Sequence, residues 1–416
     1  MNFFEFLNES VTPFHTANAL KNRFVSVGFE KLGETDTWNL ECGKNYFICR
    51  GSAVFAFRIP VTFNAESRFK LALAHTDFPA LKLTPNPCKK CAGITTLHPE
   101  IYGSPLFNTW LDRDLGYAGI LAVEKKGRVA IKLVRGGSLC RIPELAVHLN
   151  RSVNADGLKL NPQEHLDACF AEASSPDFTE VLKKELAPDE TLLDFDLQLF
   201  DTQKAALGGA NQEWIYSGRL DNLSSCDALV NGLVTADESA CDICGACFFD
   251  SEEVGSKTRD GAAGNFLKAS LERIFALLGG DSFLLNGVLA DSLLLSVDMA
   301  HAEHPSYLEK SEPNHAPLLG RGIVLKTNAQ KSYASESLAN AKLKLICNKV
   351  NVPVQTFVCR NDIPCGSTVG PTVSAALGIP TVDIGEPMLS MHSIREMTAV
   401  ADHEMMNKVM AAFFSG

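Results

Sequence analysis

Apolar residues recur along the chain at two spacings, and each spacing predicts a different kind of element. Intervals of three and four residues predict helices over residues 12–28, 262–278 and 338–350 and a final helix over 394–413. Unbroken apolar runs predict buried strands over residues 46–49, 53–59, 69–73, 291–297, 352–358 and 380–384. Because strands and helices alternate after residue 210, the sequence predicts an α/β fold.

The middle of the chain has a different pattern. Residues 119–134 are typical of a β-hairpin, and apolar and polar residues alternate over 193–199, as in a half-exposed strand. The candidate chemistry lies on both sides of this region. We therefore predict a discontinuous catalytic domain of residues 1–90 and 210–416, with a β-rich domain of residues 91–209 inserted into it.

The stretch Phe248-Phe249-Asp250-Ser251-Glu252-Glu253-Val254-Gly255 places two adjacent glutamates at the end of an apolar run. Inside a strand, neighbouring side chains point to opposite faces, so one of the two would be buried without a partner. At a turn that ends the strand, both can point into one cleft, where a metal ion would supply the missing positive charge. A solvated acidic turn after an edge strand is the alternative, and this stretch by itself leaves both open.

Other predicted strand and loop ends also carry histidine or acidic residues. With the two glutamates, the candidate set is His75, Asp77, Asp221, Glu252, Glu253, Asp298 and His392. In an open α/β sheet, ligands bind beyond the carboxyl ends of the strands. Two imidazoles and several carboxylates suit two divalent ions with one bridging carboxylate, and a free carboxylate beside them can act as a general base. Taken singly, Asp221 could instead be a helix N-cap, which is the commonest role of an aspartate where a helix begins.

Length and charge narrow the classes of partner. At 416 residues the chain exceeds an ordinary single domain, and 46% hydrophobic residues supply a substantial core. The net charge of −11 argues against nucleic acid and anionic membranes, because both bind basic surfaces. No apolar run reaches the roughly 18 residues needed to cross a bilayer.

The 13 cysteines are scattered along the chain, and the first residues lack the basic start of a secretory signal. We therefore expect reduced thiols and a cytoplasmic protein. Two groups, Cys88 with Cys91 and Cys241 with Cys244 and Cys247, have the spacing of zinc knuckles. Because Cys244 and Cys247 run into the apolar stretch before the paired glutamates, core thiols are favoured over a structural zinc site.

Short stretches in one order along the whole chain resemble the aspartyl aminopeptidase family of zinc metallopeptidases. The first of these are Ala74-His-Thr-Asp77, Asn108-Thr-Trp-Leu-Asp-Arg-Asp-Leu115, Arg141-Ile-Pro143, Ala146-Val-His-Leu149 and Leu199-Phe-Asp-Thr-Gln203. They continue with Ser217-Gly-Arg-Leu-Asp-Asn222, Phe249-Asp-Ser-Glu-Glu-Val-Gly-Ser256, Asp298-Met-Ala-His-Ala302, Arg360-Asn-Asp-Ile-Pro-Cys-Gly-Ser-Thr368 and Leu389-Ser-Met-His-Ser-Ile-Arg-Glu-Met397. So many matches in one order argue against chance.

The resemblance implies a role for each candidate. The implied metal ligands are His75, Asp221, Glu253, Asp298 and His392, with Asp221 bridging two ions. Glu252 is implied as the base that takes a proton from a bridging water, and Asp77 as the residue that orients His75. The ions are expected to be zinc, with manganese or cobalt as alternatives at one site.

The resemblance also implies substrate contacts from His301, Lys326 and Tyr333. Lys326 would meet the acidic side chain of the N-terminal residue as a point charge, although a lysine considered alone is ordinarily a surface residue. His148 would reach the active site of a neighbouring subunit, whereas the sequence around it, taken alone, favours a packed core histidine.

The expected protein is a mixed-sheet α/β/α dinuclear zinc exopeptidase with an inserted β-rich dimerisation domain. By the resemblance it assembles to a tetrahedral dodecamer and removes N-terminal Asp or Glu from peptides, through a bridging hydroxide and the base Glu252. Departures from the family pattern at residues 103–105, before Tyr333 and at Ser311 concern loop shape and substrate preference. Three alternatives stay open: a neutral residue preference, a non-catalytic metal-stabilised assembling scaffold, and a sugar or acyl-amide hydrolase on a related fold.

Overall fold

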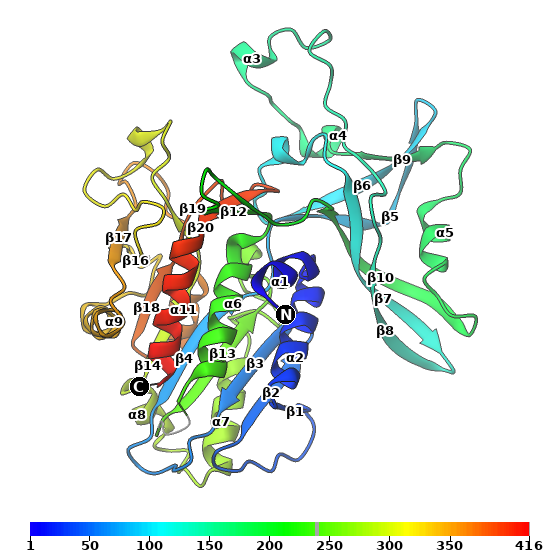
Figure 1. Ribbon diagram of the computed structural model, residues 1–416. Coiled ribbons are helices and arrows are strands. Elements are labelled where there is room, and N and C mark those ends of the chain that lie inside the picture. The colour runs from blue at the N-terminus through cyan, green and yellow to red at the C-terminus, as the bar shows by residue number, and fades with distance from the viewer. Residues whose placement is uncertain (238–240, 416) are drawn as a thin grey trace.

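The computed structural model describes residues 1–237 and 241–415, and its centre is a nine-stranded mixed sheet (Figure 1). In spatial order the strands are β1 (Glu30–Leu32), β2 (Asn45–Arg50), β3 (Ala53–Arg58), β13 (Ile243–Phe249), β4 (Phe69–His75), β14 (Leu293–Val297), β18 (Thr381–Gly385), β16 (Ile323–Thr327) and β17 (Val354–Val358). β13, β4, β14 and β18 are parallel, whereas β3 and β16 pair antiparallel with their inner neighbours. The expected mixed sheet is confirmed.

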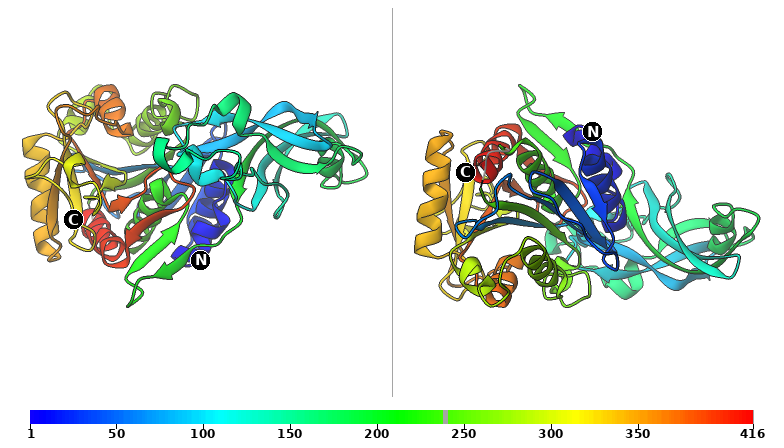
Figure 2. Two further views of the ribbon diagram at one scale, coloured as in Figure 1. Left: turned by 90° about the horizontal axis from the view of Figure 1, so that it is seen from above. Right: turned by 90° about the horizontal axis from the view of Figure 1, so that it is seen from below.

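Helices cover both faces of this sheet and complete the expected α/β/α sandwich (Figure 2). One face packs against α1 (Phe3–Glu9), α2 (Pro13–Ser26), α6 (Leu220–Thr235), α9 (Ser337–Lys349) and α11 (Val400–Ser415). The other packs against α7 (Phe266–Leu277), α8 (Leu285–Ala290) and α10 (Val369–Leu377). All residues of β13 are buried, as a strand covered on both faces requires. Within the described ranges, no helix is long and apolar enough to cross a membrane.

A second, antiparallel sheet projects from the sandwich (Figure 1). Its order is β8 (Arg128–Arg135), β7 (Leu115–Lys125), β10 (Glu190–Asp201), β5 (Ala80–Cys91), β6 (Ile94–Tyr102) and β9 (Ala168–Glu172). The same region holds α3 (Val153–Asp156), α4 (Pro162–His165), α5 (Phe178–Lys183) and the 3-10 turn η1 (Phe107–Trp110). We call residues 80–201 the insert. The predicted hairpin is β7–β8, while the division into domains at residues 91 and 209 stays a prediction.

A small third sheet follows the insert and borders the candidate site. Its order is β11 (Ala206–Gly208), β12 (Trp214–Ser217), β20 (Glu396–Ala399), β19 (Pro387–Leu389) and β15 (Ala300–His301). Two 3-10 turns, η2 (Glu252–Val254) and η3 (Leu308–Lys310), lie in loops. The prediction of a helix from residue 394 was wrong at its start, because residues 396–399 pair with β12 and β19 as strand β20. Strand pairing overrides the local helical spacing there.

Among the described residues, the cysteines of the zinc-knuckle alternative do not gather into one cluster. Cys244 and Cys247 are buried in β13 of the main sheet, whereas Cys88 and Cys91 belong to β5 of the insert. Burial raises the pKa of the Cys247 thiol well above its usual value, which keeps it neutral. The prediction of core thiols is confirmed for Cys244 and Cys247.

A buried polar cluster ties the N-terminal helices to the sandwich. His403 of α11 places Nδ1 3.0 Å from Glu386 Oε1 and Nε2 3.2 Å from Asp227 Oδ2. Arg23 of α2 donates to Asp227 at 2.6 Å, and the ring of Phe3 stacks on the imidazole with centroids 4.0 Å apart. Burial opposes a charge on His403, but Glu386 and Asp227 outweigh it and raise its pKa to about 10.

We expect this cluster to make stability depend on pH. Because the pKa of His403 is raised from 6.5 to about 10 by folding, its contribution is complete below pH 6.5 and is lost as the pH rises to 10. In the unmodified protein, the urea concentration at the unfolding midpoint should decrease as the pH rises from 6.5 to 10. In His403→Gln this decrease should be smaller. His165→Gln, an exposed control in the insert, should keep the fall. An equally steep fall in the His403 variant would contradict the assignment.

Candidate metal centre

Three neighbouring parallel strands bring predicted site residues to one edge of the main sheet. β4 ends at His75, and β14 ends just before Asp298. β13 leads into Glu252 and Glu253 through a turn in which Ser251 adopts a left-handed conformation (φ 64°). Because the carboxyl ends of parallel strands meet at one edge, residues far apart in the sequence become neighbours. The prediction that residues 248–255 form the end of a strand followed by a turn is confirmed.

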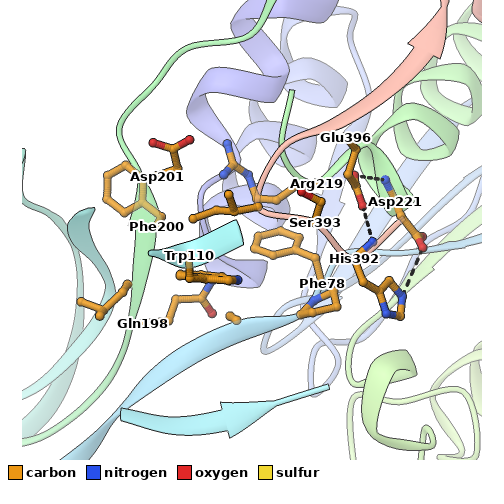
Figure 3. A pocket seen from close by; sticks show the side chains of 14 residues that line it. Phe78, Trp110, Gln198, Phe200, Asp201, Arg219, Asp221, His392, Ser393 and Glu396 are labelled. Carbon is orange, nitrogen blue, oxygen red and sulfur yellow. Dashed lines mark hydrogen bonds and ion pairs between the residues drawn. The ribbon is translucent and has the colours of Figure 1, made fainter. Parts of the chain in front are cut away.

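Two loops complete the group, and one buried carboxylate holds both of them. Asp221 lies at the start of α6, and His392 lies between β19 and β20 with φ 67°. Glu396 accepts hydrogen bonds from the backbone N–H of Asp221 at 3.1 Å and of His392 at 2.8 Å (Figure 3). The side chain of Asn222 donates to the carbonyl of Val297 at 2.9 Å, which ties the start of α6 to the end of β14.

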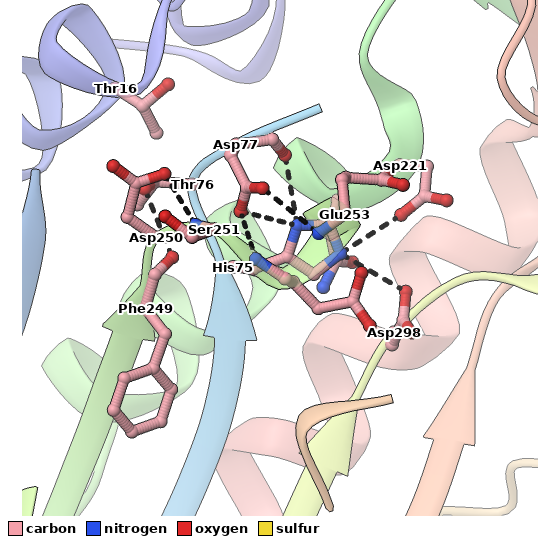
Figure 4. A network of polar contacts seen from close by, with 12 residues as sticks. Thr16, His75, Thr76, Asp77, Asp221, Phe249, Asp250, Ser251, Glu253 and Asp298 are labelled. Carbon is pink, nitrogen blue, oxygen red and sulfur yellow. Dashed lines mark hydrogen bonds and ion pairs between the residues drawn. The ribbon is translucent and has the colours of Figure 1, made fainter. Parts of the chain in front are cut away.

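Asp221 lies between the two imidazoles. Its Oδ1 is 3.4 Å from Nε2 of His75, and its Oδ2 is 3.6 Å from Nε2 of His392. Oδ1 of Asp298 lies 3.6 Å from Nε2 of His75, and Oε2 of Glu253 lies 3.3 Å from Nε2 of His392. Ligand atoms of His75, Asp221 and Glu253 also lie within 4.8 Å of one another (Figure 4). The five residues thus form two groups that share one carboxylate.

Both imidazoles turn the same nitrogen toward these carboxylates. Nδ1 of His75 lies 3.0 Å from the backbone carbonyl oxygen of Asp77, and Nδ1 of His392 lies 3.0 Å from that of Ser104. A carbonyl oxygen only accepts, so each Nδ1 carries a proton and each Nε2 is left to face the carboxylates. Metal-ligating histidines are held in the same way.

The arrangement requires added positive charge. Four carboxylates line one cleft, those of Asp221, Glu252, Glu253 and Asp298, and among the described residues that line it Lys326 supplies the one ammonium. Oδ1 of Asp221 is buried and has no hydrogen-bond partner among the described residues. The four nitrogen–oxygen separations of 3.3–3.6 Å exceed ordinary hydrogen bonds. They match the spacing of about 3.3 Å between ligands that bind one zinc ion tetrahedrally. The residues therefore fit divalent metal ions.

Without a cation, the side chains themselves take up protons. Burial opposes a charge on His75 and His392, but the facing carboxylates raise both pKa values, that of His392 to about 11. Burial also raises the pKa of Glu252 to about 8 and that of Glu253 to about 7. These groups thus favour added positive charge, whether from protons or from a metal ion.

The side chain of Asp77 holds the turn that carries both glutamates (Figure 4). Its Oδ1 accepts from the N–H of Glu252, and its Oδ2 from the N–H of Glu253, both at 3.1 Å. The carboxylate is 3.4 Å from Nδ1 of His75, farther than the backbone carbonyl of Asp77 at 3.0 Å. Asp77 therefore positions His75 mainly through its backbone and the glutamates through its side chain.

The residues expected to bind substrate line the same cleft, whose volume is about 420 Å³. His301 and Tyr333 are on its wall. Lys326 is only 2% exposed, donates to the carbonyl of Met299 at 3.0 Å and lies 3.5 Å from Oδ2 of Asp298. Its ammonium also lies 5.3 Å from the ring centroid of Tyr333. The interpretation of Lys326 as a surface lysine is wrong.

His148 does not join the cleft. It lies in the insert, in an exposed segment between β8 and α3 where Leu145 and Leu149 are also exposed. The interpretation as a packed core histidine is wrong, because this segment forms no strand or helix that could bury it.

A second, smaller cavity shares Asp221 and His392 with the cleft (Figure 3). It is lined by Phe78, Trp110 and Arg219, among others, and has a volume of about 20 Å³. That volume holds a water molecule but no peptide. The larger cleft is therefore the substrate side.

Two positions that touch the centre carry little signal in the sequence. Glu396 lies in a stretch that carries the resemblance, but its hydrogen bonds with described residues come from the backbone N–H groups of Asp221 and His392. No residue pattern marks such a role. Tyr102 ends β6 and donates to Oδ2 of Asp77 at 2.7 Å. Only the pairing of β6 with β5 brings it there.

Comparisons with known proteins show what this chain is similar to. A family model described as aminopeptidase I zinc metalloprotease (M18) matches residues 6–414. A probable aspartyl aminopeptidase of Ricinus communis is 38% identical, covering 98% of this chain and 93% of the relative. The structure of an Ape4 and Nbr1 complex contains a chain with a TM-score of 0.94 and 36% identity, covering 99% of this chain and 84% of that one. The structure of the S. cerevisiae mApe1 dodecamer contains a chain with a TM-score of 0.86 and 27% identity, covering 99% of this chain and 95% of that one.

Zinc should stabilise the folded chain, because it offsets the repulsion among buried carboxylates. Chelation should lower the melting temperature and added zinc should restore it, with about 4 kcal/mol of stabilisation at free zinc 1,000 times the dissociation constant. Asp221→Asn weakens both groups of ligands and should remove most of the increase in melting temperature that zinc causes. Asp196→Asn, on the insert, should leave that increase unchanged. Differential scanning calorimetry with and without zinc measures this. A full zinc response in the Asp221 variant would refute the shared-ligand geometry.

Proposed function

Because the chain belongs to the M18 family of zinc aminopeptidases, we propose that it removes acidic residues from the N-termini of peptides, using two divalent ions and Glu252 as the base. The observation that carries this proposal is the position of Asp221, which faces one imidazole Nε2 with each of its two oxygens. A bridging carboxylate has this geometry.

In this proposal, His75, Asp221 and Asp298 hold one ion, and His392, Asp221 and Glu253 hold the other. When bound, the ions act as Lewis acids that polarise the scissile carbonyl and acidify water. Zinc is the expected metal, since the matching family is described as zinc metalloproteases.

Glu252 is the carboxylate best placed to move protons. It lines the cleft beside Glu253, and no ion pair joins it to either imidazole in the described part of the chain. Asp77 fixes its backbone through the N–H bond at 3.1 Å. Glu252 can therefore accept a proton from the attacking water and deliver it to the leaving amine.

The acidic preference rests on Lys326. Among the described residues that line the cleft, it is the one lysine or arginine. Its burial makes a charge interaction with a substrate carboxylate stronger than it would be in water. The name of the Ricinus relative, a probable aspartyl aminopeptidase, supports the same preference.

A neutral residue preference is the second candidate, because Lys326 already donates to Met299 and faces Asp298. In that case the lysine serves the metal ligand rather than the substrate. Activity on a panel of aspartyl, glutamyl, leucyl and alanyl anilides separates the two candidates.

The proposal includes assembly of identical subunits. The related mApe1 structure is a dodecamer. In this chain, β8 exposes Val129 (68%) and Ile131 (62%), and the following segment exposes Leu149. Apolar side chains on an edge strand of the insert suit an interface between copies of the chain. His148, in the same segment, is then placed to contact a neighbouring subunit.

Glu252→Gln tests the base. It keeps the side-chain size but cannot take up a proton at neutral pH, so kcat on aspartyl anilide should fall about 100- to 10,000-fold. Zinc content, measured by atomic emission, should stay unchanged. Glu312→Gln, remote from the cleft lining, should keep full activity. Near-normal turnover by the Glu252 variant would remove it from the mechanism.

Lys326→Met tests the acidic preference. The loss of one buried charge-assisted contact should lower kcat/KM for aspartyl substrates about 10- to 100-fold. Leucyl substrates should lose much less, and Lys326→Arg should retain part of the preference. Equal losses on aspartyl and leucyl substrates would instead assign Lys326 to Asp298 and favour the neutral candidate.

A further inference from the structure

The carboxylate of Asp77 connects the metal centre to the insert. It is fully buried, and its two oxygens accept the backbone N–H groups of Glu252 and Glu253. Oδ2 accepts a third hydrogen bond, from the hydroxyl of Tyr102 at 2.7 Å. Tyr102 is the last residue of β6, and it pairs with Ala80 of β5 in the sheet of the insert.

The next two residues of the insert also touch the centre. Gly103 has φ 68°, and a Cβ there would lie 3.1 Å from Cβ of Glu253 and 3.3 Å from Cα of Pro79. The position therefore favours glycine on both conformation and space. The carbonyl of Ser104 accepts from Nδ1 of His392 at 3.0 Å. Gly103 and Ser104 thus reach Glu253 and His392, two ligands of one group. Tyr102 reaches His75 of the other group through Asp77, whose backbone carbonyl faces Nδ1 of that histidine.

The chemistry of Tyr102 suits a permanent donor. Burial, reinforced by the charge of Asp77, raises the pKa of Tyr102, so the hydroxyl keeps its proton at every physiological pH. A hydrogen bond from a neutral hydroxyl to a buried carboxylate is among the stronger protein hydrogen bonds. It fixes the direction in which the carboxylate can accept its two backbone partners.

We propose that Tyr102 is a positioning residue through which the insert sets the orientation of the metal ligands. It acts through Asp77, whose side chain holds the turn of Glu252 and Glu253 and whose backbone holds His75. The insert is then part of the metal centre rather than only a surface for assembly. This inference rests on the ligand set proposed above.

The test is the zinc affinity of Tyr102→Phe, which removes one oxygen atom and leaves the ring. Metal-free protein is titrated with zinc chloride against a chromophoric chelator. Loss of a partner that orients metal ligands weakens metal binding about 10- to 100-fold, and that is the expected change. Raising free zinc to saturation should restore kcat on aspartyl anilide, which a misfolded variant would not show.

Tyr117→Phe is the matched control. Tyr117 also lies in the insert, and its hydroxyl also donates to a carboxylate, Glu185, at 3.1 Å. Its zinc affinity should stay within about twofold of the unmodified protein, since its bond is within the insert. Equal zinc affinity of the Tyr102 variant and the unmodified protein would overturn the inference. So would an equal loss in both tyrosine variants, which would indicate a general loosening of the insert.

His75→Ala separates failure of this inference from failure of the proposed ligand set. The His75→Ala variant should bind zinc more weakly than either Tyr102→Phe or Tyr117→Phe. If His75→Ala bound zinc normally, the ligand set itself would be wrong, and the role of Tyr102 would be overturned with it. If His75→Ala lost zinc while Tyr102→Phe did not, only the role of Tyr102 would be overturned.

Discussion

Two imidazole nitrogens and four carboxylates face one another in a buried cleft, and these groups repel unless a cation lies among them. The repulsion is strong because the low polarity of the surroundings weakens screening. The ammonium of Lys326 offsets part of this repulsion, and the raised pKa values of His392 and Glu252 show that the other groups favour added positive charge. The need for positive charge is the constraint from which the surrounding structure follows.

The structure meets this constraint by fixing backbone as well as side chains. The ligands come from five separate segments: the end of β4, the start of α6, the turn after β13, the residue after β14 and the loop between β19 and β20. Asp77 and Glu396 each accept two backbone N–H groups beside the ligands. An intramolecular hydrogen bond contributes about 1 kcal/mol net, so these four together are a sizeable share of a typical total stability of about 5–15 kcal/mol. The ligands are therefore positioned before a metal arrives.

Much of the sandwich could be predicted from the sequence, because its buried strands are continuous apolar runs. The end of β13 and the turn after it were predicted from the stretch Phe248 to Gly255. Their positions at strand and loop ends made His75, Asp221 and His392 candidates, but their roles followed only from the resemblance, since their spacing is too long for a local motif. Strand β20 was missed because its pairing with β12 and β19 depends on residues far away. Tyr102 and Glu396 were missed for the same reason: hydrogen bonds to backbone, or across two sheets, leave no periodic pattern.

The central claim is that Asp221 is shared by two metal ions. Crystals of the zinc-loaded protein, measured with X-rays just above and below the zinc absorption edge, test it directly. The account predicts two anomalous peaks per subunit, one among His75, Asp221 and Asp298 and the other among His392, Asp221 and Glu253. A single peak, or peaks that leave Asp221 uncoordinated, would contradict it.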